Sequence, residues 1–253
     1  MHALIVLAHP EPRSFNAQLK DIAAETLAAQ GYSVAVSDLY AQGFDPVEGP
    51  RHFAQRKKPD WFGAQTEQRH AADTGATARD VQSEIDKLAR ADFVLFQYPI
   101  WWFSMPAILK GWIDRVFTFG GVYTGTNRYE NGRFLGKRAM VSVTAGAPGP
   151  SYDYNGRSGE LSLLLWPMHK SLVYVGYDVL PPYLSPGIQD GIKYDGREDE
   201  IARIEACKAG LADRLRTLDA LTPLRFNKMS DFDASGRLKP DSQGYSPFIR
   251  TRP

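Results

Sequence analysis

The stretch QYPIWWFSMPAILK, residues 97–110, is the most informative part of this chain of 253 residues. An apolar run at 92–96 precedes it and predicts a buried strand, and Pro106 stands where a helix would begin. The turn between strand and helix holds one isoleucine and three aromatic residues: Ile100, Trp101, Trp102 and Phe103. Turns normally use Gly, Asn, Asp or Ser, because these residues satisfy the local backbone. Large apolar groups at the carboxyl end of a strand therefore predict a flat, apolar ligand, and a planar cofactor ring is the first candidate.

The composition narrows the class of protein. A hydrophobic content of 43% can support a substantial core, in one large domain or two small ones. The formal charge of +1 gives no general attraction to nucleic acid or to an anionic membrane. No apolar run approaches the ~20 residues that span a bilayer, and residues 1–10 lack the basic region of a secretion signal. We therefore expect a cytoplasmic protein that binds no nucleic acid and does not insert into a membrane.

Cysteine and histidine give no sign of a metal site. Cys207 is the single cysteine, which excludes an intramolecular disulfide and a site made of several cysteines. His52, His70 and His169 are scattered without the spacing of metal ligands. No GxSxG sequence or Cys-His pairing indicates nucleophilic catalysis.

Short apolar runs alternate with segments of helical length, which is the pattern of a parallel sheet built from βαβ units. Strands are expected at residues 3–8, 33–37, 92–98, 139–143 and 177–180. Helices are expected at residues 15–30, 78–90, 106–117, 161–173 and 198–218, with a kink at Pro167. This order predicts an α/β protein with a flavodoxin-like, doubly wound, five-stranded parallel sheet and helices on both faces.

Two segments fall outside this pattern. Residues 41–77 are polar and weakly periodic, which indicates either a functional loop or a disordered insert. Residues 222–253 also lack periodicity, but they contain more aromatic residues than disordered tails usually do. We expect one flavodoxin-like domain over residues 1–221 and a C-terminal tail, residues 222–253, that packs on this domain or on a partner subunit.

The loop HPEPRSFN, residues 9–16, follows the first strand and enters a helix. The N-terminus of a helix offers unpaired N–H groups and a partial positive charge, which suit a phosphate. His9, Arg13, Ser14 and Asn16 add side-chain donors. A helix cap explains Ser14 equally well, and a lone histidine such as His9 is usually structural. The chain has no GxGxxG or GxxxxGK[ST] sequence at this position, so neither a Rossmann fingerprint nor a P-loop is indicated.

A second loop, residues 144–159, is expected to face the aromatic one. It is rich in small residues, which permits close approach of the backbone to a ligand. Tyr152 in this loop can donate its hydroxyl to an anion that develops on a reduced ring. An ordinary core or surface tyrosine is an equally good explanation from the sequence.

With these loops in place, the chain resembles the NAD(P)H:quinone oxidoreductase family of flavodoxin-like flavoproteins. The matching segments are ALIVLAHPEPRSFN (3–16), SDLYAQGFDP (37–46), ADFVLFQYPIWWFSMPAILKGWIDRVF (91–117) and LLLWPMHKSLVYVGYDVLPP (163–182). They occur in family order and together extend over most of residues 3–220.

The resemblance implies a noncovalent flavin, FAD rather than FMN, and a homodimer with active sites at the subunit interface. It implies phosphate and ribityl contacts from His9, Ser14, Phe15 and Asn16, to which Arg13 is added as a side-chain donor. Contacts to the ring are implied for Pro99, Ile100, Trp101, Trp102, Phe103, Thr144, Gly146, Ala147 and Tyr152. Phe103, Tyr123 and Ser158 would line the substrate pocket, Tyr123 from the partner subunit.

The sequence departs from the vertebrate pattern of this family. Ser158 stands where the family has a histidine paired with the active-site tyrosine, and Gly125 replaces a second pocket tyrosine. Ala147 replaces a glycine and Trp101 a glutamine. The missing histidine requires another group, Tyr152 alone or Arg157, to stabilise the anion of the reduced flavin.

The expected function is therefore a flavin-dependent oxidoreductase that takes hydride from NADH or NADPH and reduces a quinone by two electrons. Because both substrates would use one pocket, ping-pong kinetics are expected. Tyr152 is the expected catalytic residue. Alternatives are a reductase of azo, nitro or other electrophilic acceptors, and a regulatory flavoprotein subunit of a membrane transporter.

Overall fold

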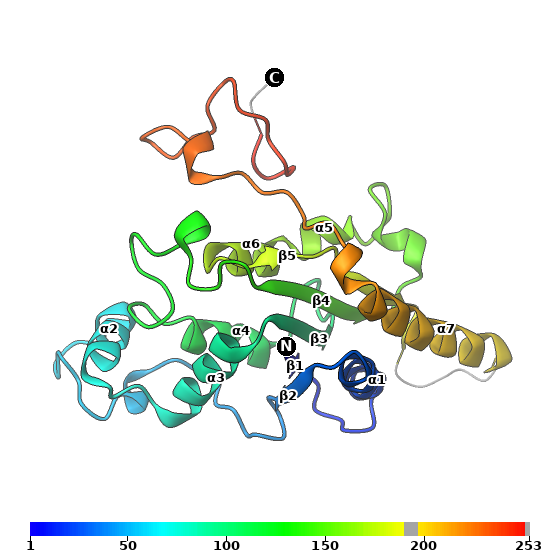
Figure 1. The fold of residues 1–253 in the computed structure, drawn as a ribbon, viewed down its shortest axis with the longest axis horizontal. Helices are drawn as coiled ribbons and strands as arrows, with labels where there is room; N and C mark the ends of the chain where they lie inside the picture. Colours follow the sequence, from blue (N-terminus) through cyan, green and yellow to red (C-terminus); the bar gives the residue numbers. More distant parts are fainter. Residues whose placement is uncertain (190–196, 251–253) are drawn as a thin grey trace.

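The computed structural model describes residues 1–189 and 197–250. A parallel sheet forms its centre, in the order β2-β1-β3-β4-β5 (Figure 1). The strands are β1 (His2–Leu7), β2 (Ser33–Asp38), β3 (Phe93–Pro99), β4 (Arg138–Ala145) and β5 (Asp178–Val179). The predicted flavodoxin-like α/β fold is confirmed, with each predicted strand present.

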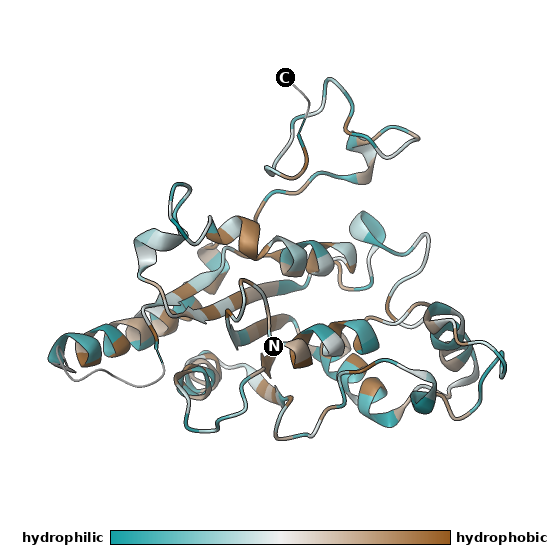
Figure 2. Ribbon diagram, turned by 180° about the vertical axis from the view of Figure 1, so that it is seen from behind, coloured by the Kyte–Doolittle hydropathy of each residue, from teal (hydrophilic) through white to brown (hydrophobic). Residues whose placement is uncertain are grey.

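Helices cover both faces of the sheet. Helices α1 (Phe15–Ala29) and α7 (Arg197–Arg216) lie on one face, and α3 (Arg79–Arg90), α4 (Ala107–Val116) and α6 (Trp166–Tyr174) lie on the other. Successive strand residues point to opposite faces, so Ile5 packs under α1 and α7 whereas Val6 packs under α3 and α4. The helices carry both hydrophobic and hydrophilic bands, as half-buried helices must (Figure 2).

The last edge of the sheet is broken into two short strands. Strand β6 (Tyr183–Pro186) continues beyond β5 along the same neighbour, β4. Pairing moves from Ala139↔Val179 to Ser142↔Tyr183, so three residues on the edge lie opposite two on β4. Pro181 and Pro182 lie in this interruption, because proline cannot donate to a sheet and is tolerated at edge bulges. Strand β6 had no counterpart in the predicted elements.

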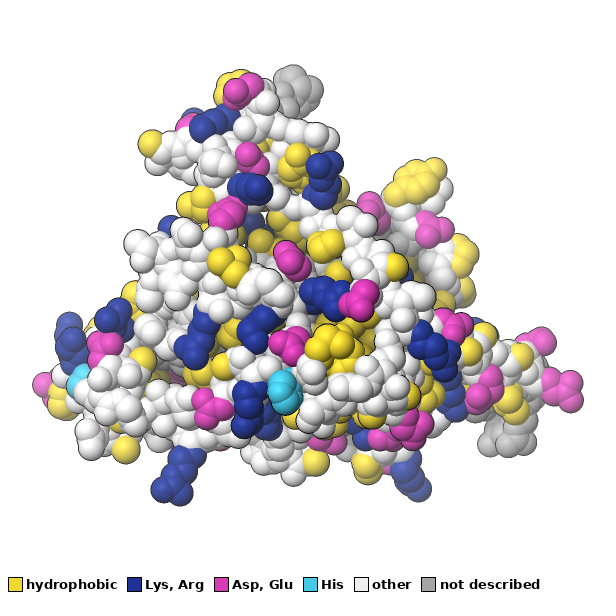
Figure 3. Space-filling view, viewed as in Figure 1, with side chains coloured by type: hydrophobic (Ala, Val, Ile, Leu, Met, Phe, Trp, Pro, Cys, Tyr) yellow, Lys and Arg dark blue, Asp and Glu magenta, His cyan; other side chains and the backbone are white. Residues whose placement is uncertain are grey.

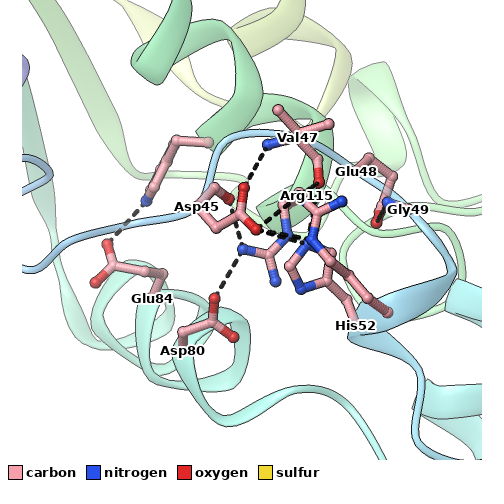
Figure 4. Close-up of polar contacts among 10 residues, drawn as sticks. Asp45, Val47, Glu48, Gly49, His52, Asp80, Glu84 and Arg115 are labelled. Carbon is pink, nitrogen blue, oxygen red and sulfur yellow. Dashed lines mark hydrogen bonds and ion pairs between the residues drawn. The ribbon is translucent and has the colours of Figure 1, made fainter.

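Residues 41–77, for which the sequence indicated a functional loop or a disordered insert, contain regular structure. They contain the short helical turn η1 (Pro50–His52) and the helix α2 (Ala64–Thr74). Figure 4 shows how the segment is fastened: the buried Arg115 on α4 donates to the carbonyl of Asp45 at 2.7 Å and to the carboxylate of Asp80 at 2.8 Å. A Cβ on Gly111 would lie 2.1 Å from the carbonyl oxygen of Pro46, so this contact requires glycine.

The helix expected at 161–173 is also different from the prediction. Two helices, α5 (Leu161–Leu164) and α6, replace one kinked helix, and the break falls at Leu165. Pro167 stands in the first turn of α6, where its missing N–H is not needed. A proline therefore starts a new helix here instead of bending a continuous one.

The segment after α7 leaves the sheet and ends in the projecting part at the top of Figure 1. It begins with η4 (Leu218–Ala220) and later contains η5 (Met229–Asp231). Leu224 donates its N–H to the carbonyl of Val179 at 2.7 Å. The ring of Trp166 contacts Phe226 and Phe248, with centroid separations of 5.7 and 5.3 Å. The tail is thus held to α6 by aromatic contacts.

Candidate active site

Three loops meet where β1, β3 and β4 end. These strands are neighbours in the sheet, and all three are parallel, so their carboxyl ends lie along one edge. The chain runs from β1 to β2 on one side and returns at β3 on the other, which makes the β1–β3 boundary a switch point. Ligands of doubly wound sheets bind outside this edge, and most residues predicted for the site lie in these loops.

The loop after β1 contacts the loop after β3. The ring of His9 lies against Trp101, with centroids 5.8 Å apart and planes inclined by 57°. The Nδ1 atom of His9 accepts the N–H of Glu11 at 3.1 Å, which places the proton of the neutral ring on Nε2. The loop after β3 is joined in turn to β4, because Ile100 donates its N–H to the carbonyl of Thr144 at 2.8 Å.

Helix α1 begins at this edge with a defined cap. Ser14 accepts the N–H of Ala17 through its side chain at 3.1 Å, so the capping role considered for it is present. The N–H groups of Phe15 and Asn16 have no hydrogen-bond partner within the described residues. They are the donors that a helix N-terminus offers to an anion such as phosphate.

Arg13 is engaged within its own loop. Its side chain is 89% exposed and forms an ion pair with Glu11 at 2.9 Å. The hydrogen bond from Arg13 lowers the pKa of Glu11, which keeps this carboxylate ionised. Because the charge of Arg13 is matched by Glu11, the loop offers an anion little net positive charge from its side chains.

The side chain of Asn16 points into the protein. Its amide Nδ2 donates to the hydroxyl of Thr144 at 2.9 Å, and its Oδ1 accepts from the amide of Gln97 at 2.9 Å. All three residues are buried. Asn16 and Thr144 were predicted for the site, whereas Gln97 was not. A single amide inside the apolar run FVLFQY of β3 is the signal in the sequence that could have indicated it.

The aromatic loop is a tight turn. Trp101 and Ser104 exchange two backbone hydrogen bonds of 3.0 Å, and the two residues between them, Trp102 and Phe103, have positive φ angles of 49° and 60°. Bulky residues adopt this conformation at a cost of about 1–3 kcal/mol each. The turn presents large apolar rings to solvent, since Trp102 is 94% exposed. The N–H groups of Trp102 and Phe103 have no partner in the described part of the chain.

The loop after β4 closes on itself and carries Tyr152. The short helical turn η3 (Gly149–Tyr152) is followed by a return in which Ser158 donates its N–H to the carbonyl of Ser151 at 3.0 Å. Ser158 thus lies beside Tyr152 in the fold. Tyr152 is mostly buried. Its hydroxyl has no hydrogen bond among the described residues, and it is accessible to solvent.

Gly146 and Ala147 lie against the segment that follows β6. The backbone of Ala147 accepts the N–H of Gly187, and Gln189 donates its side-chain amide to the carbonyl of Gly146 at 3.1 Å. Residues 187–189 therefore line this loop. They were not among the residues predicted for the site.

Tyr123 lies in the segment between α4 and β4. Its hydroxyl accepts from Gln65 at 3.0 Å, and its ring meets Tyr174 edge-on at 5.3 Å. It lines a cavity of about 680 Å³ between α2, α4 and α6. A second cavity, of about 550 Å³, is lined by Trp101 and Trp102 of the aromatic loop. The two cavities adjoin, because Ile113, Pro167 and Ser171 line both of them.

The described residues contain no cluster of His, Cys, Asp and Glu that could hold a metal ion. In the same part of the chain, no helix is long and apolar enough to cross a membrane. On the face seen in Figure 3, basic and acidic side chains are interspersed, so this face presents no surface of a single charge.

The fold and the ligand edge define a protein of the flavodoxin-like class, and a model of the family described as flavodoxin-like fold matches residues 1–208. NAD(P)H dehydrogenase (quinone) 1 of Cavia porcellus is 39% identical over 233 residues, which cover 91% of this chain and 82% of that protein. Ribosyldihydronicotinamide dehydrogenase (quinone) of Pongo abelii is 41% identical over 184 residues, 72% of this chain and 80% of that protein.

A Klebsiella pneumoniae structure assigned to the quinone reductases superposes with a TM-score of 0.87 at 35% identity, covering 97% of this chain and 96% of that chain. The chain therefore belongs to the NAD(P)H:quinone oxidoreductase family of flavodoxin-like proteins, and it is an oxidoreductase. The resemblance noted in the sequence is confirmed.

Proposed function

We propose that this protein is a flavin-dependent reductase that oxidises NADH or NADPH and reduces a quinone by two electrons. The observation that carries the proposal is the meeting of three loops at the sheet edge, in which His9 contacts Trp101 and Asn16 bonds to Thr144. A bound flavin supplies the chemistry, because it accepts hydride from the nicotinamide and passes two electrons to the acceptor. FAD is the proposed form.

The residues at this edge fit a flavin. The N–H groups of Phe15 and Asn16 at the start of α1 suit a phosphate, and the exposed rings of the aromatic loop suit a planar ring system. The N–H groups of Trp102 and Phe103 can hydrogen-bond the polar edge of that ring system. Gly146 and Ala147 have small side chains, which leave room for a ligand to approach the backbone of this loop.

Tyr152 is the proposed catalytic residue. Its hydroxyl can donate a hydrogen bond to negative charge that develops at the ring during reduction. The resemblance assigns to position 158 the partner of this tyrosine, and a serine hydroxyl cannot carry a positive charge. We therefore propose that Tyr152 acts without a protonated partner at position 158. The proposed order of events is ping-pong, with one pocket used by both substrates.

We propose a homodimer as the active form. Trp102 and Phe103 are 94% and 58% exposed, and such aromatic groups on a protomer surface are typical of an interaction site. Tyr123 lines a cavity that adjoins the aromatic loop of its own protomer, and we propose that it contacts the substrate of a second subunit. We also propose a cytoplasmic location, where the lone Cys207 needs no disulfide partner.

The test is to purify the protein, release any bound flavin and identify it by chromatography beside FAD and FMN. A yellow protein that releases FAD, or an apoprotein that is restored by FAD, is expected. A colourless protein that takes up neither flavin contradicts the proposal.

A panel of quinone, azo and nitro acceptors then separates the candidate reactions by their kcat/KM values with NADH and with NADPH. The quinones are expected to give the highest values, and a clear preference for azo or nitro compounds would replace the quinone as acceptor. Negligible turnover with all acceptors, together with co-purification of a membrane transporter, would favour the regulatory role.

A further inference from the structure

The buried side chains of Asn16, Gln97 and Thr144 form one hydrogen-bonded unit across the sheet. Gln97 donates to Oδ1 of Asn16 at 2.9 Å, and Nδ2 of Asn16 donates to Oγ1 of Thr144 at 2.9 Å. Asn16 and Thr144 are each 3% exposed, and Gln97 is 0% exposed. The bonds join residues 81 and 128 positions apart, so no local turn or helix requires them.

Each member of this unit stands at the base of a different loop of the proposed site. Asn16 is the second residue of α1, directly after the loop from β1. Gln97 lies two residues before the end of β3, and Thr144 is next to the end of β4. The carbonyl of Thr144 also accepts the N–H of Ile100, which extends the connection into the aromatic loop.

The two ends of Asn16 serve different purposes. Its side chain is buried in the protein, where it donates one hydrogen bond to Thr144 and accepts one from Gln97. Its backbone N–H is left without a partner in the described residues and belongs to the helix N-terminus. A change in how the side chain is held would therefore move the N–H group that faces the ligand edge.

We infer that Gln97 and Thr144 are positioning residues that act through Asn16: they fix the distance between the phosphate-binding end of α1 and the loops that bind the flavin ring. This inference rests on the proposed function. A ligand that carries both a ring and a phosphate gains from binding to two subsites only when their separation matches its own length. The unit makes this separation a property of the folded protein before the ligand arrives.

The energetics favour such a role. Buried side-chain amides are costly unless their hydrogen bonds are made, because removal of one partner leaves the other desolvated and unpaired. The Oε1 atom of Gln97 already lacks a partner within the described residues, so the amide is kept at a cost. A leucine would fill this position in a strand more favourably, which indicates that the hydrogen bond to Asn16 serves the site.

The test compares riboflavin, which has a ring and no phosphate, with FMN and FAD, which have both. The dissociation constants are measured by quenching of flavin fluorescence on apoprotein, well below the unfolding temperature. For the wild type, the phosphate-bearing flavins are expected to bind much more tightly than riboflavin. In Thr144→Val, which removes the acceptor of Asn16, this advantage should fall about tenfold. Riboflavin binding should stay within about twofold, because the side chain of Thr144 is buried, its hydroxyl accepts from Asn16, and any contact of this residue with the ring is through its backbone.

Two further variants make the result specific. Thr144→Ser retains the hydroxyl and should restore most of the lost advantage. Ser142→Ala is the matched control, because Ser142 is buried beside Gln97 in register and its hydroxyl has no partner in the described chain. It should leave the ratio of the dissociation constants unchanged.

Gln97→Glu adds a pH profile and carries the test if Thr144→Val does not fold. A protonated Glu at this position can donate to Oδ1 of Asn16, whereas an ionised one repels it. The advantage of FMN over riboflavin should therefore fall with rising pH in Gln97→Glu, beyond any change seen in the wild type. Unchanged ratios in Thr144→Val and Gln97→Glu, or equal weakening of riboflavin and FMN, would overturn the inference and leave the proposed function standing. Failure of the wild type to bind any flavin would overturn both.

Discussion

His9 and Trp101 are far apart in sequence, with α1, β2, α2, α3 and β3 between them. Their rings nevertheless lie 5.8 Å apart at the carboxyl edge of the sheet. The contact joins the loop that begins α1 to the loop that begins α4. In the proposed function, the first loop serves the phosphate and the second serves the ring. The pair therefore marks the point where the two parts of the ligand meet.

Replacing Trp101 tests this contact. Trp101→Ala removes an apolar wall that is 42% exposed, so stability should change by less than about 1 kcal/mol while flavin affinity falls at least about tenfold. Trp61→Ala is a suitable control, since Trp61 is 58% exposed and lies outside the three loops. Flavin titration and thermal unfolding measure the two effects. Equal flavin affinity in both variants would remove Trp101 from the site.

Tyr152 is tested by deleting its hydroxyl alone. Tyr152→Phe should slow reduction of the bound flavin by NAD(P)H about tenfold to hundredfold, because a hydrogen-bond donor to developing charge is lost. Flavin content should remain close to that of the wild type. Stopped-flow measurement of a single turnover gives the rate directly. Tyr154→Phe, two residues away and with an 85% exposed ring, should have no effect; the same rate in wild type and Tyr152→Phe would end the catalytic role.

Arg115 on α4 is expected to hold residues 41–77 to the rest of the protein. Its side chain is 1% exposed and bonds to Asp45 and Asp80, and its guanidinium lies 5.0 Å from the centre of the Phe44 ring. Arg115→Met should lower the free energy of unfolding by about 3 kcal/mol, because the ion pair and the carbonyl contact are both lost.

The control for Arg115 is the exposed pair of Lys110 and Asp114 on the same helix. Lys110→Met should cost less than about 1 kcal/mol. Urea unfolding provides both values, and limited proteolysis of residues 41–77 should be faster in Arg115→Met. Equal stability of the two variants would show that the buried guanidinium does not anchor the segment.

His169 predicts a specific loss of stability in acid. Burial lowers the pKa of His169 to about 4, from an ordinary value near 6.5. Because the folded protein favours the neutral ring, the stabilisation is complete above pH 6.5 and is lost as the pH falls toward 4. The total effect of this one group is roughly 3 kcal/mol, from linkage between protonation and folding.

Comparison with His169→Gln isolates this effect from the titration of the carboxylates. The difference in unfolding free energy between wild type and variant should change by roughly 3 kcal/mol between pH 7 and pH 4. A constant difference across this range would mean that His169 is protonated as easily in the folded protein as in the unfolded chain.

The main elements of the fold were predictable because each has a clear pattern of residues within its own segment of the sequence. The apolar run before Gln97 is buried on both faces of the sheet, and Ser14 caps α1 where a helix was expected. Strand β6 could not be found in this way, since a four-residue edge strand after two prolines has no periodic signal. Helix α2 was missed because it is polar on most of its surface and is held by other parts of the chain.

The chain's own pattern of residues was enough to specify the parallel sheet, its ligand edge and the loops that form it, because strand burial, helix caps and turn chemistry depend on neighbours within a few positions. The partners within that edge depend on the tertiary structure. Gln97 meets Asn16, Arg115 meets Asp45, and Tyr123 meets Tyr174, through contacts between elements that are distant in sequence. Such contacts depend on how the helices pack on the sheet. The order of residues along the chain does not indicate which buried polar groups will face each other after packing.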